Sequence, residues 1–171
     1  MISSAAFMSH QPVIDGFQFA SAGATQQGAF PASAFPRLRD LLASDAGEVA
    51  YTLRGLLDAR GRPSLGLRLS GTLQLRCQRC LEPMAFEVRH EGMLVLAATQ
   101  ADIDADPKDT SAPDRVLAGK QMPVRELVED ELLLAVPFAP RHERCVGASG
   151  MDEEGKASPF AELRGLLQSR H

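Results

Sequence analysis

The sequence predicts an α+β fold, in which an antiparallel β-meander or partly open barrel carries a few short helices. Two runs of alternating apolar and polar residues, 65–77 and 84–90, are joined by a short turn, which is the pattern of an antiparallel hairpin. A third alternating run at 49–57 precedes them, and an apolar pattern of helical period follows over 124–135. Strands in series with few helices predict one domain over 1–171.

The chain before this meander has weaker patterns. Residues 13–19 predict a short strand, and the stretch 21–34, rich in Ala, Gly, Gln and Ser, predicts a flexible connection. Pro36 opens a predicted short helix, since Pro is favoured at the first helical position. Its apolar residues at helical spacing are Leu38, Leu41 and Leu42.

Two segments are expected to be flexible. Residues 1–12 are small and polar, and we expect a loose N-terminus. Residues 98–120 predict an acidic, mobile loop because they hold two prolines and five aspartates, namely Asp102, Asp104, Asp106, Asp109 and Asp114.

The strongest helical pattern begins at Pro123 and is stopped by Pro137. The carboxylates of this helix are a candidate docking face for a basic protein; they are Glu126, Glu129, Asp130 and Glu131. An ordinary solvated surface is the alternative interpretation. A second amphipathic helix is predicted near the C-terminus, with Ser158 as its N-cap and apolar residues at Phe160, Leu163, Leu166 and Leu167.

Cys77 and Cys80 form a C-x2-C pair in the turn of the predicted hairpin, a spacing that lets two thiolates reach one zinc ion. The pair can also form a redox disulfide, although the βαβ setting usual for that motif is missing, or pack as inert thiols. Because a zinc site needs about four ligands, His142 and Cys145 are the candidates that would complete it. Zinc is therefore a candidate cofactor.

The composition excludes several classes of protein. Hydrophobic residues at 44% and charged residues at 23% are globular values. Trp is absent and Tyr occurs once, which argues against an extensive platform for base stacking. Three cysteines suit a reducing compartment, and neither a secretory signal nor a membrane-length apolar run is found. We expect a cytoplasmic protein without membrane association.

Catalysis is not expected. No hydrolase elbow, phosphate-cradling glycine loop or zinc-protease helix occurs in the sequence. The histidines show no partner pattern and stand at His10, His90, His142 and His171. The prediction is a non-catalytic protein without a small-molecule substrate.

Charge is unevenly distributed along the chain. Residues 49–90 hold seven arginines and three carboxylates, a balance of +4, so the remainder of this chain of net charge −4 carries −8. Arginines in the polar phase of the strands should share one sheet face, with another at the turn; they are Arg54, Arg68, Arg76 and Arg89, with Arg79 at the tip. Guanidinium groups pair with phosphate, so these are candidate RNA-binding residues, although a solvated sheet face is the alternative.

Three motifs occur in order: residues 77–83 (CQRCLEP), residues 128–137 (VEDELLLAVP) and residues 159–161 (PFA). In this order the chain resembles the YceD family, the large ribosomal RNA subunit accumulation proteins. The segments Val13-Ile14-Asp15 and Pro36-Arg37-Leu38 fit as well. The resemblance implies a cytoplasmic, non-catalytic factor needed for 23S ribosomal RNA to accumulate or be processed. Some relatives carry a further cysteine cluster after the acidic helix, where this chain has 141–145 (RHERC).

Two hypotheses follow. In the first, the protein is a factor in large-subunit assembly that binds ribosomal RNA, or an assembly protein, through its basic sheet face. In the alternative, it is a zinc-stabilised module for protein–protein interaction that makes no direct contact with RNA.

Overall fold

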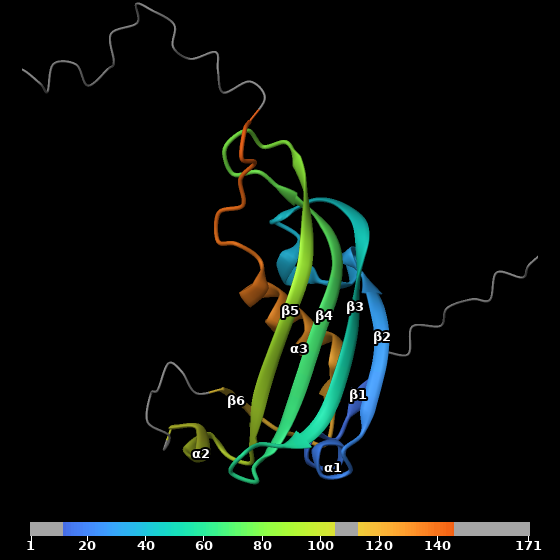
Figure 1. Ribbon diagram of the computed structural model, residues 1–171, viewed down its shortest axis with the longest axis vertical. Helices are drawn as coiled ribbons and strands as arrows, with labels where there is room; N and C mark the ends of the chain where they lie inside the picture. The colour runs from blue at the N-terminus through green and yellow to red at the C-terminus, as the bar shows by residue number, and fades with distance from the viewer. Residues whose placement is uncertain (1–11, 105–112, 146–171) are drawn as a thin grey trace, which may run out of the picture.

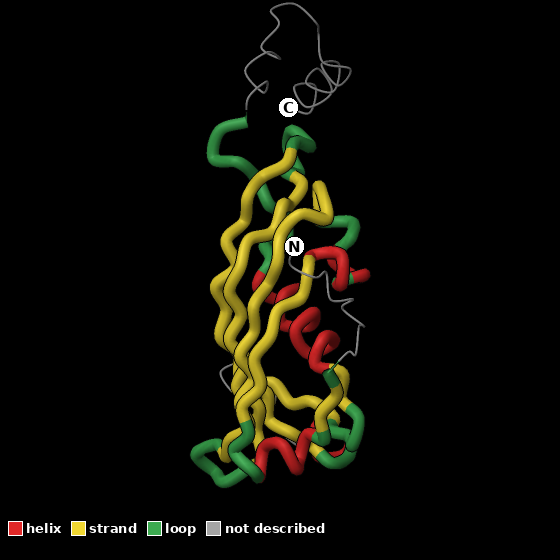
Figure 2. The backbone as a smooth tube through the Cα atoms, turned by 90° about the vertical axis from the view of Figure 1, so that its right-hand side faces the viewer, coloured by secondary structure: helices red, strands yellow, loops and turns green. Residues whose placement is uncertain are grey.

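A single curved sheet with a helix across one of its faces makes up most of the described chain (Figures 1 and 2). The structure is a computed structural model that describes residues 12–104 and 113–145. The predictions for residues 1–11, for the middle of the acidic segment and for the C-terminal helix lie outside these ranges.

Three long antiparallel strands form the centre of the sheet: β3 (Leu42–Leu57), β4 (Pro63–Arg76) and β5 (Pro83–Ala97). The order is β2-β3-β4-β5-β6, with β2 (Thr25–Pro31) antiparallel to β3 and β6 (Asp114–Leu117) parallel to the end of β5. The predicted α+β meander is confirmed. The sheet is open at β2 and β6 and does not close into a barrel.

Helix α3 (Val124–Ala135) covers one face of the sheet, as the side view shows (Figure 2). We call this the inner face. The alternation in β4 buries its apolar residues against the helix, and the deepest of them are Leu65, Leu67, Leu69, Leu73 and Leu75. Val124, Val128 and Leu132 of α3 are fully buried in the same core. Among the described residues no helix covers the opposite face, which we call the outer face (Figure 2).

The remaining elements are short. A two-stranded ladder joins β1 (Val13–Ile14) to β7 (Met122–Pro123), directly before α3. The others are α1 (Gly16–Ser21), α2 (Gln100–Asp104) and the 3-10 turns η1 (Ala32–Ala34) and η2 (Pro36–Leu38).

Several predictions for the N-terminal region were wrong. The predicted strand over 13–19 ends at Ile14, because the side chain of Asp15 accepts the N–H of Gln18 at 3.0 Å and starts α1. The predicted flexible connection contains β2, whose weak local propensity is overcome by seven residues of pairing with β3. Phe30 of β2 stacks on Tyr51 of β3 with ring centroids 5.2 Å apart.

The predicted helix after Pro36 is also wrong, because it is reduced to the single turn η2 and the chain enters β3 at Leu42. Leu38 and Leu42 are buried as their spacing indicated, but in a 3-10 turn and a strand. A bulge shifts the β3–β4 register between Leu42 and Gly47. Gly47 has a φ of +117°, and a Cβ there would lie 2.2 Å from the carbonyl oxygen of Thr72, so only glycine fits this bulge.

The described part of the acidic segment is more ordered than a mobile loop. It contains α2 and β6, and Asp102 bonds the N–H and the hydroxyl of Thr99 at 2.9 and 2.8 Å. Arg115 of β6 donates to the backbone carbonyl of Asp102. Within the described residues no helix is long and apolar enough to cross a membrane.

Candidate metal centre and arginine face

The turn between β4 and β5 is a tight knuckle around Cys77. The N–H of Cys77 donates to the carbonyl of Glu82 at 3.0 Å, and the N–H of Leu81 donates to the carbonyl of Cys77 at 2.9 Å. Leu81 takes a positive φ of 65°, which folds the chain sharply after Cys80. As a result the N–H of Arg79 points at the Cys77 sulfur, 3.4 Å away, and the two cysteines face the same side.

The segment after α3 brings the second pair of residues to this turn (Figure 1). The N–H of Gln78 donates to the carbonyl oxygen of Pro140 at 2.8 Å. Cys145 then lies with its sulfur 3.8 Å from that of Cys77, and Nδ1 of His142 lies 3.3 Å from the sulfur of Cys80. The four ligand atoms are all within 4.8 Å of one another. We call this group, Cys77, Cys80, His142 and Cys145, the Cys3His cluster.

The imidazole of His142 is oriented by a second contact. Its Nε2 lies 3.2 Å from the carbonyl oxygen of Pro83, which can only accept a hydrogen bond. Nε2 therefore carries the proton and Nδ1 presents its lone pair to the cluster. Metal-bound histidines show this arrangement, in which one nitrogen is held by a carbonyl while the other binds the ion.

The pKa values of Cys77 and Cys145 are shifted in opposite directions. Backbone N–H groups, first that of Cys80, outweigh burial and lower the pKa of Cys77 to about 5. Burial, together with the neighbouring thiols of Cys77 and Cys80, raises the pKa of Cys145 to about 11. The surroundings of the cluster therefore favour thiolate charge at Cys77 and disfavour it at Cys145.

The cross-strand register places four predicted arginines on the outer face. Arg54 is opposite Gly66, Arg68 is opposite Thr52 and Glu91, and cross-strand partners share a face. Arg89 is opposite Ser70 and Arg76 is opposite Pro83, which puts both in the same phase as Arg68. A hollow of about 170 Å³ lies between Arg54 and Arg68, where Gly66 has no side chain.

Carboxylates on the same face reduce its positive charge. Nε of Arg68 lies 2.7 Å from Glu91, and Nη2 of Arg89 lies 2.6 Å from Glu87. Glu91 stands one residue beyond the basic segment counted in the sequence, so it was missed there. Within the described chain no carboxylate pairs with Arg54, Arg76 or Arg79 in the structure.

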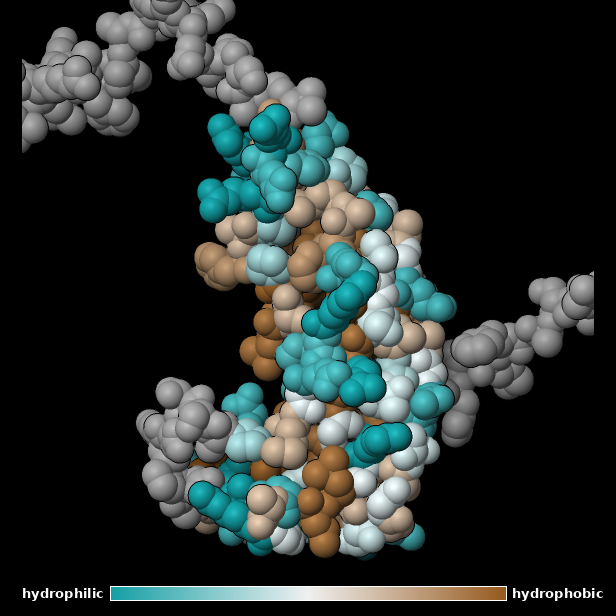
Figure 3. All heavy atoms as spheres, viewed as in Figure 1, coloured by the Kyte–Doolittle hydropathy of each residue, from teal (hydrophilic) through white to brown (hydrophobic). Residues whose placement is uncertain are grey.

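Two further arginines reach the turn with the second half of the cluster. Arg141 and Arg144 flank His142 and are exposed, as is Arg79 on the turn itself. Figure 3 shows hydrophilic residues gathered over this end of the molecule. These two arginines were not counted in the sequence analysis, although the candidate ligands His142 and Cys145 beside them were a signal that this segment meets residues 77–83.

The candidate docking face on α3 requires a correction for two of its four members. Glu129 and Glu131 are only 2% and 4% exposed and are bound inside the chain, so they cannot form a docking surface. Oε2 of Glu131 lies 2.5 Å from Nε2 of His90. Glu126 and Asp130 are exposed, and their role as docking residues stays a prediction.

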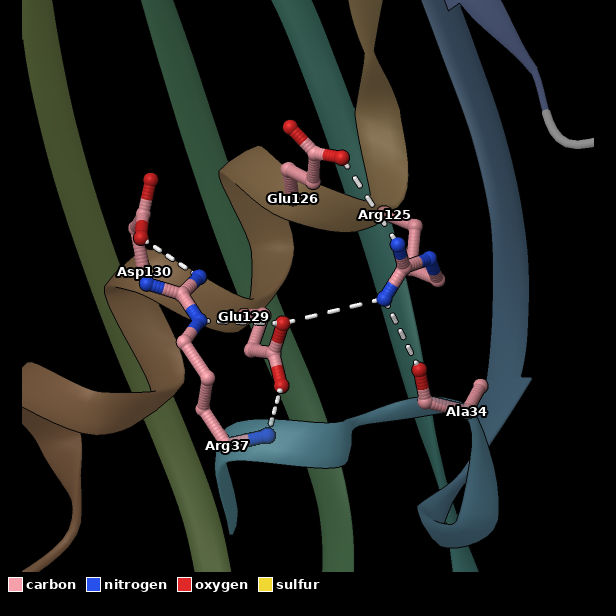
Figure 4. A network of polar contacts seen from close by, with 6 residues as sticks. All are labelled: Ala34, Arg37, Arg125, Glu126, Glu129 and Asp130. Carbon is pink, nitrogen blue, oxygen red and sulfur yellow. Dashed lines mark hydrogen bonds and ion pairs between the residues drawn. The ribbon is translucent and has the colours of Figure 1, made fainter.

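Glu129 is the centre of a polar network between α3 and η2 (Figure 4). Its carboxylate accepts the backbone N–H of Arg37 at 2.7 Å and lies 3.2 Å from the Nε of the same residue. Arg125 approaches it at 3.7 Å and also donates to the carbonyl of Ala34 at 3.1 Å. The carboxylate of Asp130 lies 2.6 Å from Nη2 of Arg37. These acidic residues of α3 therefore fix the N-terminal region.

These features define an α+β protein whose open sheet has one arginine-bearing face that no described helix covers, and whose hairpin tip carries a Cys3His cluster. The comparison with protein families then identifies the chain more closely. It belongs to the YceD family: the family model, described as Large ribosomal RNA subunit accumulation protein YceD, matches residues 65–167, more than half of the chain. The comparison with solved structures found no match.

The matched region includes β4 except for the first two residues of that strand. It also includes the whole of β5, the Cys3His cluster and α3. Arg54 lies before the match, whereas the other predicted RNA-binding arginines lie within it. The resemblance noted in the sequence is thereby confirmed. The family's description gives the protein a role in the accumulation of the large ribosomal RNA subunit.

Proposed function

We propose that this protein is a cytoplasmic, non-catalytic factor that promotes 23S ribosomal RNA accumulation by holding precursor RNA on its outer face. The family membership supports the ribosomal role. The observation that carries the RNA contact is the common orientation of Arg54, Arg68, Arg76 and Arg89 on a face that no described helix covers.

The dimensions of the face suit a nucleic-acid backbone. Arg68 and Arg76 are eight residues apart on β4, which corresponds to roughly 27 Å of extended strand. Phosphates along such a length can each meet a guanidinium from a neighbouring strand, and Arg79 continues the row onto the tip. No aromatic residue falls in the outer-face phase of β3, β4 or β5, so recognition would use RNA shape and backbone rather than base stacking.

The arginines differ in what they offer to RNA. Arg68 and Arg89 must exchange an exposed carboxylate partner for phosphate, and exposed pairs of this kind are weak, about 0–1 kcal/mol. Arg54 and Arg76 have no carboxylate to give up in the described chain. These two should therefore contribute most to binding.

The test is the affinity of the full chain for in vitro transcribed 23S ribosomal RNA across a salt series. Arg54→Glu combined with Arg76→Glu should weaken binding at least tenfold and reduce the slope of log K against log salt by about 1.4 to 1.8. The matched control reverses two exposed cations away from the three long strands, Arg39→Glu with Lys120→Glu, and should change the affinity little. Equal losses of RNA affinity in both double variants would show that only net charge matters, and would contradict RNA binding by the outer face.

The competing function is a zinc-stabilised module that contacts protein only. The observations that favour it are the Cys3His cluster and the exposed carboxylates Glu126 and Asp130, which would suit a basic assembly protein of the large subunit. Salt-sensitive binding to 23S ribosomal RNA that is lost with Arg54 and Arg76 decides against this alternative. Absence of RNA binding by the pure chain decides for it.

A further inference from the structure

We propose that Cys77, Cys80, His142 and Cys145 bind one zinc ion, and that this ion fastens the segment after α3 to the tip of the β4–β5 hairpin. The inference does not depend on RNA binding. It rests on the ligand geometry, on the donor types and on the way in which the two halves of the cluster are joined.

The distances fit a tetrahedral ion. Two sulfurs each about 2.3 Å from a tetrahedral zinc lie about 3.8 Å apart, and a sulfur and an imidazole nitrogen lie about 3.6 Å apart. The sulfurs of Cys77 and Cys145 are 3.8 Å apart, and Cys80 and His142 approach to 3.3 Å. All four atoms fall within 4.8 Å, so one ion can contact them together with small adjustments.

The donor set selects the metal and its role. Three thiolates and one imidazole are soft to intermediate ligands that favour zinc over magnesium or calcium, which take oxygen. Four protein ligands fill the tetrahedral shell and leave no open position for water or substrate. The site is therefore structural, in agreement with a non-catalytic protein.

The surroundings prepare the ligands before any ion binds. The N–H of Arg79 already points at the sulfur of Cys77, at 3.4 Å, and stabilises a thiolate there. Pro83 holds the imidazole of His142 with Nδ1 directed inward. Hydrogen bonds of this outer shell fix ligand orientation, and their loss typically lowers metal affinity about 10–100-fold.

The ion would join two parts of the chain between which few hydrogen bonds are found among the described residues. The segment 137–145 contains no helix or strand and follows the end of α3. Outside the cluster, the hydrogen bonds between this segment and the turn in the described chain are those from Gln78 to Pro140 and between His142 and Pro83. Binding zinc across 62 and 68 residues of sequence therefore supplies most of the link and keeps Arg141 and Arg144 beside Arg79.

The first experiment measures metal in the full chain, purified under a non-chelating reductant without added zinc. We expect one zinc per chain, and replacement by Co²⁺ should give the visible bands of tetrahedral cobalt with thiolate ligands. Cys145→Ser should lower zinc affinity more than the 100-fold upper range of outer-shell changes, while Cys145→His should largely restore it. A metal-free wild type, or undiminished zinc in Cys145→Ser, overturns the site.

The second experiment tests, in the wild-type chain, whether the metal attaches the segment 137–145 to the turn between β4 and β5. It therefore needs no variant. Trypsin cleaves after Arg141 and Arg144, and the metal should protect these bonds at least tenfold relative to the chelator-treated protein. Cleavage after Arg60, in the turn between β3 and β4, is the internal control and should not depend on metal. Equal cleavage at 141 and 144 with and without zinc would contradict the fastening, whatever the outcome with RNA.

Discussion

Arg37 and Glu129 contact each other twice across 92 residues of sequence, once through the backbone N–H and once through the guanidinium. Glu129 is 2% exposed, whereas 48% of the Arg37 side chain remains in solvent. The hydrogen bond that Arg37 donates to Asp130 contributes most to raising the pKa of Arg37, with Glu129 adding to it. The contact therefore satisfies a buried carboxylate with a cation whose side chain is about half exposed.

Removing this carboxylate should destabilise the fold. Glu129→Ala leaves the N–H of Arg37 without its acceptor and removes one of the two carboxylates, those of Glu126 and Glu129, that lie 3.7 Å from Arg125. Because Arg37 can recover water, we expect a loss of about 2–3 kcal/mol in the free energy of unfolding rather than the larger figure for a fully buried pair. Urea denaturation measures it. The control Glu126→Ala, on the exposed side of the same helix, should stay within about 0.5 kcal/mol.

Gly92 of β5 should not tolerate a methyl group. A Cβ at this position would lie 2.3 Å from Oε2 and 2.9 Å from Cδ of Glu131, whose carboxylate is held by His90. Gly92→Ala is expected to lower the free energy of unfolding by about 1–3 kcal/mol. In a Glu131→Ala background the same substitution should cost much less, since the clashing group is gone. Strictly additive effects in this double-mutant cycle would show that the clash is relieved elsewhere.

Neutralising the carboxylates of the outer face should strengthen RNA binding. Glu87→Gln with Glu91→Gln releases Arg89 and Arg68 from pairs worth about 0–1 kcal/mol each, so a roughly two- to tenfold gain in affinity is expected. The salt dependence should become steeper. Thermal unfolding of this double variant should match the wild type, because both pairs are exposed. Unchanged affinity would mean that RNA does not meet this part of the face.

Asp58 should give the turn between β3 and β4 a dependence on acid. Its carboxylate accepts the N–H groups of Arg60 and Arg62 at 2.9 and 2.8 Å, and Nε of Arg62 at 2.7 Å. The Arg62 backbone bond is the main cause that lowers the Asp58 pKa below its ordinary value. The lowered pKa means that Asp58 stabilises the fold above about pH 4 and that this contribution is lost as pH falls through the folded-state pKa.

The corresponding measurement compares wild type with Asp58→Asn. The difference in the free energy of unfolding should be widest near neutral pH and should shrink as the solution is acidified below about pH 4. An NMR titration of the Asp58 carboxyl would check the direction independently. If the difference in the free energy of unfolding stayed constant down to pH 2, the charge of Asp58 would not contribute to stability and the backbone shape of the turn alone would account for it.

The parts of the structure that the sequence predicted are those with a strong local period. The alternation through Leu65–Leu75 identified β4 and its buried face, and Pro123 and Pro137 bounded α3. Glu131 shows how a signal can be present and still be misjudged: it lies on the apolar stripe of α3, four residues after Leu127, yet was assigned to a docking face. Its partner His90 lies 41 residues away, so the pairing was not readable locally.

The parts that were missed depend on contacts between distant segments. β2 has few strand-forming residues and exists because β3 offers it a ladder and Tyr51 offers a stacking partner for Phe30. The two halves of the Cys3His cluster were suggested by residue type and spacing. Their meeting depends on the return of the chain after α3, which no local pattern in 137–145 encodes.

The strands β2, β3, β4 and β5 lie in the sheet in the same order as in the chain. During translation each strand can thus pair with the one made just before it, at a low entropic cost of loop closure. Helix α3 is synthesised only later, so the leucine row of β4 stays uncovered until then. The interval between the synthesis of β5 and that of α3 is therefore when the nascent chain is most prone to aggregate and most in need of a chaperone.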